Sequence, residues 1–153
     1  MTARLLPVLL CATLAACSSF DAEWRAAKDG ATRWDGRWTS GKHRTRSGEP
    51  SGGRLRCVLT EAASDCFPAK RPARPAQALR ASFHANWMVF SSDYTMTLTP
   101  LSGSRTEFRG THALPAIFGG TYRYTARIAG DRFTARYDSS YDHGTFDLTR
   151  VRP

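Results

Sequence analysis

The chain has 153 residues, of which 41% are hydrophobic and 23% are charged, and its formal net charge at pH 7 is +9. This length predicts one domain with a single core and argues against an assembly of several domains. The positive charge favours anionic partners, such as acidic lipids or polymers, through long-range attraction. The alternative is that the cations only solvate the outer surface of the domain.

The first sixteen residues have the layout of a secretory signal peptide. Arg4 supplies a positive start, and the apolar run from Leu5 to Ala16 is too short for a membrane-spanning helix of roughly 20 residues. The segment Leu14-Ala15-Ala16-Cys17 resembles the lipobox of bacterial lipoproteins. This resemblance implies that residues 1–16 are removed and that Cys17 is acylated. The alternatives are an uncleaved anchor and a plain secretory signal that leaves Cys17 unmodified.

The lipobox resemblance also implies a location in the bacterial cell envelope. In such lipoproteins an aspartate after the cysteine tends to cause retention at the inner membrane, whereas this chain has Ser18 there. We therefore expect the outer membrane, with the chain facing the periplasm, and the membrane itself as the first partner through acylated Cys17. Export also argues against nucleic acid as a partner.

Residues 17–33 are expected to form the lipidated N-terminus and a short helix. Ser19 or Asp21 can cap a helix that Gly30 ends. At helical spacing, three apolar side chains fall on one face, namely those of Phe20, Trp24 and Ala27. The helix can lie on the membrane beside the anchor or plug one end of the domain.

From residue 34 to residue 153 the apolar pattern changes to the period of two that is typical of strands. No segment is long enough for a crossover helix, so the sheet should be antiparallel. Closure removes exposed sheet edges, and the pattern therefore predicts an all-β, up-and-down barrel of about eight strands, with a β-sandwich as the alternative. The expected strands lie near 36–42, 53–60, 78–88, 93–99, 105–112, 120–129, 132–139 and 145–151.

The strand register is clearest in the last third of the chain. A two-residue turn at Gly130–Asp131 would pair Ile128 with Phe133 and Tyr124 with Tyr137, which gives one apolar face and one polar face. A second turn at His143–Gly144 would pair Tyr141 with Phe146 and Ser139 with Leu148.

Besides Cys17, two cysteines remain in the exported part of the chain, Cys57 and Cys66. In an oxidising compartment such a pair indicates a disulfide, closed here by a hairpin that turns near Glu61–Ala62. Metal binding by two cysteines without a histidine motif is the weaker alternative. Residues 67–76, rich in proline and cations, predict an extended solvated loop that either touches an acidic polymer or membrane headgroups or is only a surface insertion.

The first expected strand carries Gly36-Arg37-Trp38, which resembles the G-x-W that opens the first strand of the calycins, the superfamily of lipocalins and avidins. The resemblance implies a calycin-like barrel in which Trp38 closes one end and packs against a basic residue of the last strand. Arg150 is that residue here, placed to cover the Trp38 ring in a cation–π contact. Biotin-site residues and the later lipocalin motifs are not recognisable in this chain.

The sequence does not indicate an enzyme. The four histidines lack metal-ligand spacing, so neither a metal nor a cofactor is expected. Asp142-His143 has no nucleophile motif beside it and is typical of a hairpin turn. Glu107 and Asp138 both point outward in the predicted register, so they do not form the carboxylate pair of a glycosidase.

The predicted inward face is rich in aromatic side chains with polar tips, which suits a cavity for a small amphipathic ligand. The apolar segment 113–118 followed by two glycines could serve as a lid over one mouth; the alternative is a barrel filled by its own rings. The sequence thus predicts an envelope lipoprotein that is a non-catalytic binding or interaction module for a small apolar or amphipathic ligand. The alternatives are adhesion to anionic envelope polymers and inhibition of a periplasmic protein through a loop at 67–77. The candidate lining residues are Trp87, Tyr94, Tyr122, Tyr124 and Tyr137, with Tyr141 on the same predicted face.

Overall fold

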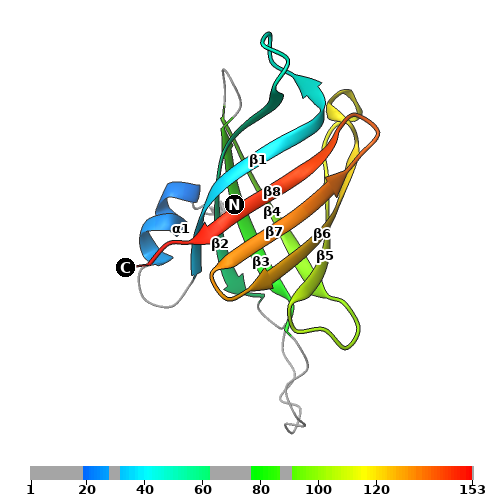
Figure 1. Ribbon diagram of the computed structural model, residues 1–153. Coiled ribbons are helices and arrows are strands. Elements are labelled where there is room, and N and C mark those ends of the chain that lie inside the picture. Colours follow the sequence, from blue (N-terminus) through cyan, green and yellow to red (C-terminus); the bar gives the residue numbers. More distant parts are fainter. Residues whose placement is uncertain (1–18, 28–31, 63–76, 87–90, 153) are drawn as a thin grey trace, which may run out of the picture.

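Eight antiparallel strands follow one another around a closed barrel, in which the last strand also pairs with the first (Figure 1). The computed structural model describes residues 19–27, 32–62, 77–86 and 91–152. The predicted all-β, up-and-down barrel is therefore confirmed, and the β-sandwich alternative is excluded because two open sheets would not close. The barrel is consistent with a calycin-like fold. The strands are β1 (Thr32–Arg44), β2 (Pro50–Glu61), β3 (Leu79–Asn86), β4 (Ser91–Pro100), β5 (Glu107–Ala113), β6 (Thr121–Ala129), β7 (Arg132–Asp138) and β8 (His143–Arg150).

Alternating side chains from every strand fill the inside of the barrel. Apolar and aromatic residues at every second position turn inward, which is the arrangement that the period of two predicts. Trp34, Phe83 and Phe133 are the largest side chains that are fully buried. Ring contacts link them, because Phe133 lies edge-on to Trp34 at 5.8 Å and near Phe83 at 6.2 Å between ring centroids.

The predicted register is correct for one hairpin and wrong for the next. Ile128 pairs with Phe133 and Tyr124 with Tyr137, as expected across the turn at Gly130. β8, however, begins at His143, so Phe146 lies opposite Ala135 and Leu148 opposite Phe133. The turn therefore occupies residues 139–142 and not His143–Gly144, because a pattern of alternation does not reveal where a longer loop starts.

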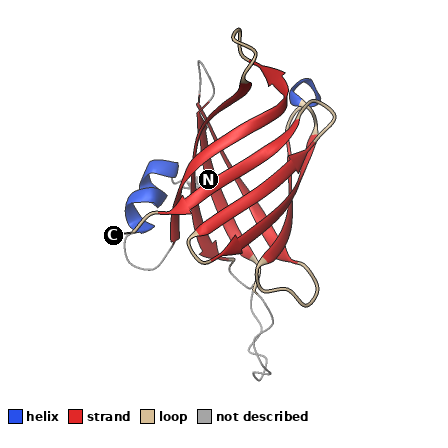
Figure 2. Cartoon of the chain, in the orientation of Figure 1, coloured by secondary structure: helices blue, strands red, loops and turns tan. Residues whose placement is uncertain are grey.

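A short helix, α1 (Phe20–Ala26), lies against the outer wall of the barrel at β2 and β3 (Figure 2). Its Phe20 is buried with Val58 of β2, and Trp24 packs beside them. Two hydrogen bonds of 2.9 and 3.0 Å join the Arg80 guanidinium to the Glu23 carboxylate. The predicted helix is confirmed, although it ends at Ala26 and Ser19 makes no side-chain capping bond. In the described ranges no helix has the length and apolar character needed to cross a membrane.

The G-x-W segment lies at the seam between β1 and β8. A methyl group on Gly36 would lie 2.1 Å from the Asp147 carbonyl oxygen, so only glycine allows the two strands to approach here. The Trp38 indole N–H donates a 2.9 Å hydrogen bond to the Asn86 carbonyl.

The prediction that Arg150 covers Trp38 is wrong. In the observed register Trp38 lies opposite Phe146, whereas Trp34 lies opposite Arg150. The Arg150 guanidinium therefore sits over the Trp34 ring, 5.1 Å from its centroid. The predicted cation–π contact of Arg150 with a tryptophan of β1 therefore exists, but the tryptophan is Trp34 and not Trp38.

The predicted Cys57–Cys66 disulfide is also wrong, because Cys57 is a free thiol. It points into the core, where it lies opposite Trp34 on one side and Phe83 on the other. Glu61 pairs with Leu79, so the chain does not turn back at Glu61–Ala62 as the prediction required. Burial raises the pKa of the Cys57 thiol well above its usual value, which makes it an unreactive core residue. Cys66 lies outside the described residues.

Candidate functional site

Four of the five predicted lining residues gather inside the barrel, but they pack on one another. Tyr122 and Tyr124 lie 5.9 and 6.2 Å from Tyr137, and Tyr94 stacks on Phe83 at 5.0 Å, all between ring centroids. Burial raises the pKa of Tyr94, Tyr124 and Tyr137, so their phenols stay neutral. This packing supports the filled-core alternative for the part of the interior that these rings occupy. Trp87 lies outside the described residues.

Tyr141 was expected on the inward face, and this is a further error of the sequence analysis. Its side chain is 48% exposed because residues 139–142 form the turn and not a strand. The Lys42 ammonium lies over its ring, 5.6 Å from the centroid.

The barrel wall is weakest between β4 and β5. Only two residue pairs join these strands, Thr99 with Arg109 and Pro100 with Phe108, whereas seven join β5 to β6. Beyond them the His112 ring of β5 lies 5.0 Å from the Tyr94 ring of β4 between ring centroids. Burial lowers the pKa of His112, so the ring is neutral in this position at pH 7.

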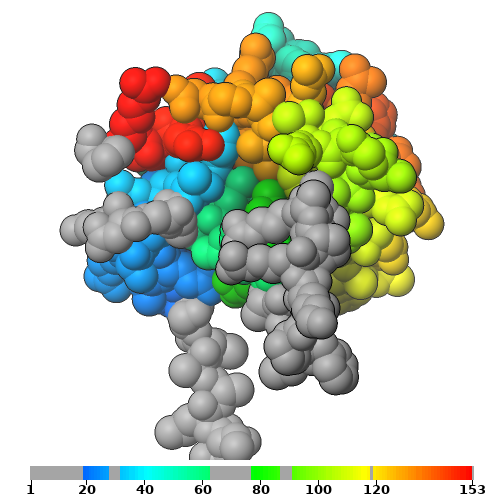
Figure 3. Space-filling model, turned by 90° about the horizontal axis from the view of Figure 1, so that it is seen from below, coloured from blue at the N-terminus to red at the C-terminus, as the bar shows by residue number. Residues whose placement is uncertain are grey.

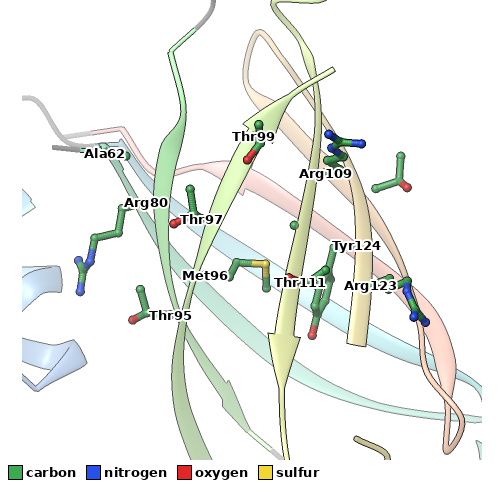
Figure 4. A pocket seen from close by; sticks show the side chains of 12 residues that line it. Ala62, Arg80, Thr95, Met96, Thr97, Thr99, Arg109, Thr111, Arg123 and Tyr124 are labelled. Atoms are coloured by element: carbon green, nitrogen blue, oxygen red, sulfur yellow. The ribbon is translucent and has the colours of Figure 1, made fainter. Parts of the chain in front are cut away.

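An open groove of about 900 Å³ follows this seam on the outside of the barrel (Figure 4). Its floor includes Met96, Gly110 and Tyr124. The side chains of Met96 and Tyr124 are almost fully buried. Arg80 lies on one side of the groove, and Arg109 and Arg123 lie on the other. The remaining lining residues are Ala62 and five threonines, namely Thr95, Thr97, Thr99, Thr111 and Thr125.

The groove has a strongly positive lining with no acidic residue in it. Arg80 is engaged by Glu23 of α1, 2.9 Å away. Within the described ranges no ion pair involves Arg109 or Arg123, although Asp138 of β7 lies opposite Arg123 in the register. A planar guanidinium binds carboxylate or phosphate through two parallel hydrogen bonds. Threonine hydroxyls add neutral donors and acceptors, and Met96 adds a polarisable apolar surface.

A second hollow, of about 360 Å³, lies at the end of the barrel where β8 finishes. Trp34, Leu59 and Leu79 line it together with Glu61 and Arg150. Seen from this end, α1 and the β4–β5 turn lie on different sides of the molecule (Figure 3). Because Arg150 is already stacked on Trp34 and bridged to Asp131 at 3.7 Å, this mouth offers a ligand less unused charge than the groove does.

A buried polar network at the opposite end was missed by the sequence analysis. The Asp142 carboxylate accepts a 2.8 Å hydrogen bond from the Ser40 hydroxyl and a 2.9 Å bond from the Tyr137 phenol. Asp142 and Ser40 are only 4% and 1% exposed. The network fixes the 139–142 turn to β1, and the sequence offered no signal for it because Ser40 is 102 positions away.

The remaining chemistry-bearing residues are dispersed. His84 is on the outer face, where it pairs with Asp93 and stacks on Phe20 at 5.4 Å. Glu107 and Asp138 are exposed on the outer wall. In the part of the chain that the structure describes, no three histidine, cysteine or acidic side chains are placed to hold a metal ion. The lipobox and the loop at 67–76 lie outside that part.

Comparison with protein-family models, with curated proteins and with solved structures finds no match to this chain.

Proposed function

We propose that the protein is a non-catalytic binding module of the bacterial cell envelope, anchored through acylated Cys17, and that it takes a small amphipathic anion in the β4–β5 groove. The groove carries this proposal, because Arg109 and Arg123 line it beside Met96 and Tyr124 and no acidic residue is part of the lining. An anionic headgroup fits the guanidinium groups and a short apolar tail fits the floor.

Binding is favoured over catalysis by the kinds of side chain in the groove. The arginines and threonines do not accept a proton at neutral pH, and burial raises the pKa of the Tyr124 phenol. General acid–base chemistry needs a group whose pKa lies near the working pH. The groove lining supplies recognition groups and no such base.

The binding proposal is tested with a fluorescent fatty acid, dansyl-labelled undecanoate, and with its neutral methyl ester. We expect the acid to bind more tightly than the ester. Charge-assisted hydrogen bonds contribute about 1.5–3 kcal/mol each, so Arg109→Gln combined with Arg123→Gln should weaken binding of the acid at least about tenfold. Binding of the ester should change little.

The matched control removes the same charge elsewhere. Arg44→Gln combined with Arg46→Gln lies in the β1–β2 hairpin, where both side chains are exposed, and it should leave the affinity for the acid unchanged. Equal losses in the two double variants, or equal affinity of the wild type for acid and ester, would refute the proposed site.

An anionic polymer is the second candidate ligand, because the arginines continue beyond the groove. Arg127 of β6 and Arg136 of β7 are exposed on the same outer wall as Arg123. A polymer would span this row, whereas a small amphiphile would not. Dextran sulfate serves as the test polymer, and its affinity is compared between two double variants. If Arg127→Gln combined with Arg136→Gln lowers that affinity as much as Arg109→Gln combined with Arg123→Gln does, the polymer is the better assignment.

The anchor is tested separately, in bacteria fed with labelled palmitate. We expect the wild-type chain to carry the label and to sediment with membranes, and Cys17→Ser to lose both properties. Cys11→Ser is the control, because Cys11 lies in the segment that the lipobox assigns to removal, and it should behave like the wild type. Labelling of the Cys17→Ser chain, or an unlabelled wild type, would contradict acylation at this position.

A further inference from the structure

The apolar segment between β5 and β6 forms an exposed tip at the upper end of the barrel (Figure 2). It contains the short helix η2 (Ala116–Phe118). The Ile117 side chain is 78% exposed and that of Leu114 is 37% exposed. The sequence suggested a lid for this segment, yet Ile117 points to solvent, so the segment presents a small apolar surface at this end.

Hydrogen bonds hold this tip in place. The Leu114 N–H donates to the Gly120 carbonyl at 2.9 Å, and the Gly119 N–H donates to the Ala116 carbonyl at 3.1 Å. Gly119 has a φ of 101°, which favours glycine and permits the tight return of the chain. The Ser140 hydroxyl also donates to the Gly119 carbonyl at 3.0 Å, which ties the tip to the neighbouring turn. Ile117 is therefore presented by an ordered loop.

Cationic and aromatic side chains lie beside the tip. A methyl group on Gly119 would lie 2.6 Å from Cβ of Tyr141, so the base of that exposed side chain borders the tip. The Lys42 ammonium donates a 3.0 Å hydrogen bond to the Tyr141 carbonyl and covers its ring. The β1–β2 hairpin, which carries exposed Arg44 and Arg46, projects at the same end of the barrel (Figure 1).

Acidic groups near the tip do not cancel this charge. Asp142 is buried, and both of its carboxylate oxygens accept hydrogen bonds from Ser40 and Tyr137. Glu49 of the β1–β2 hairpin and Asp138 at the end of β7 are the exposed acids among the described residues 40–49 and 138–144 at this end. Three exposed cations, Lys42, Arg44 and Arg46, thus lie on β1 and its hairpin at the same end of the barrel as the apolar tip, against two exposed acids.

We propose that this upper end docks onto an anionic lipid surface, with Ile117 and Leu114 entering the interfacial region and Lys42, Arg44 and Arg46 facing the headgroups. Tyr141 lies between the two zones, where an amphipathic ring is favoured. A stable protein interface buries about 800 Å² on each partner, which three exposed apolar side chains do not provide. Shallow insertion needs far fewer, because lipid tails solvate each inserted side chain while cations add attraction. The surface is separate from the β4–β5 groove and does not depend on the function proposed for it.

The test is co-sedimentation with sucrose-loaded vesicles, using residues 17–153 with Cys17→Ser. This chain contains every described element and has no acylation site. We expect binding to vesicles of phosphatidylglycerol and phosphatidylcholine, with little binding to phosphatidylcholine alone. Ile117→Asp, and separately Arg44→Gln combined with Arg46→Gln, should each reduce the partition coefficient about tenfold.

Controls separate this surface from the groove and from general charge effects. Thr145→Asp adds the same charge on the exposed outer wall as Ile117→Asp adds at the tip, and it should bind vesicles like the wild type. Arg109→Gln combined with Arg123→Gln should also retain vesicle binding, and circular dichroism checks that each variant is folded. Absence of wild-type binding, equal binding to neutral vesicles, or equal losses for the tip and wall variants would each overturn the proposal.

Discussion

Replacing Trp34 by alanine is expected to lower the free energy of unfolding by about 4 kcal/mol, the range measured when a buried aromatic side chain is truncated. Trp34 is 0% exposed and lies between the core and the lower end of the barrel. The substitution removes its edge-on contact with Phe133 and uncovers Arg150, and the rigid strands around it cannot collapse into the space. Urea denaturation followed by far-ultraviolet circular dichroism gives the value.

Trp34→Phe should cost much less, roughly 1–2 kcal/mol, because most of the ring volume is retained. The Trp34 indole nitrogen is buried and has no hydrogen-bond partner among the residues that the structure describes, so phenylalanine forfeits no bond to them. Equal losses for the two variants would contradict an energy dominated by packing. The same comparison at Trp38 has a different expected outcome, because Trp38→Phe also leaves the Asn86 carbonyl without its donor.

A double-mutant cycle locates the partner of Arg150. Its guanidinium lies over Trp34, and cation–π contacts at partly exposed sites contribute about 0.5–1 kcal/mol. Arg150→Gln should therefore couple with Trp34→Leu by about this amount and should not couple with Trp38→Leu. If Arg150→Gln couples with Trp38→Leu and not with Trp34→Leu, the Arg150–Trp34 contact is contradicted and the Arg150–Trp38 contact implied by the calycin resemblance is supported.

The fold was predictable because its main determinant is local. Alternation of apolar and polar residues places side chains on two faces without any knowledge of distant partners. The β6–β7 register followed from the turn at Gly130, whose φ of 57° suits glycine and limits the turn to one place. The β7–β8 turn lacks such a signal, so Tyr141 was placed inward although it is exposed.

The candidate site was less predictable because it depends on contacts between distant residues. The groove lies where β4 and β5 pair at only two positions. The alternation of apolar and polar residues does not show how many residue pairs two neighbouring strands will form. The sequence supplied the positive charge as a sum, whereas the gathering of Arg80, Arg109 and Arg123 along one groove emerges from the cross-strand arrangement. The error at Cys57 has the same origin, because its strand pairs with a segment that begins at Leu79.

Replacing Asp142 by alanine is expected to lower the free energy of unfolding by about 3–4 kcal/mol, because two buried donors lose their acceptor and each unsatisfied group costs about 1–3 kcal/mol. The Ser40 hydroxyl and the Tyr137 phenol donate to opposite oxygens of this carboxylate. Ser40 also accepts hydrogen bonds from the backbone N–H groups of Lys42 and His43, at 3.2 and 2.8 Å. Loss of the carboxylate should therefore loosen the end of β1 together with the 139–142 turn.

A conservative series separates the lost hydrogen bonds from the lost volume. Asp142→Asn keeps the shape and one oxygen acceptor, so we expect a loss of roughly 1–2 kcal/mol, and combining it with Tyr137→Phe should cost less than the sum of the two single variants. Asp138→Ala is the matched control, since that carboxylate is exposed on the neighbouring strand, and surface changes of this kind stay within about 0.5 kcal/mol. Hydrogen exchange should show faster opening at residues 40–43 and 139–142 in Asp142→Ala before the rest of the barrel is affected. If Asp142→Ala is no less stable than Asp138→Ala, the Asp142 carboxylate does not hold this end of the barrel together. The Ser40 hydroxyl and the Tyr137 phenol would then have found water or other acceptors without a loss of stability.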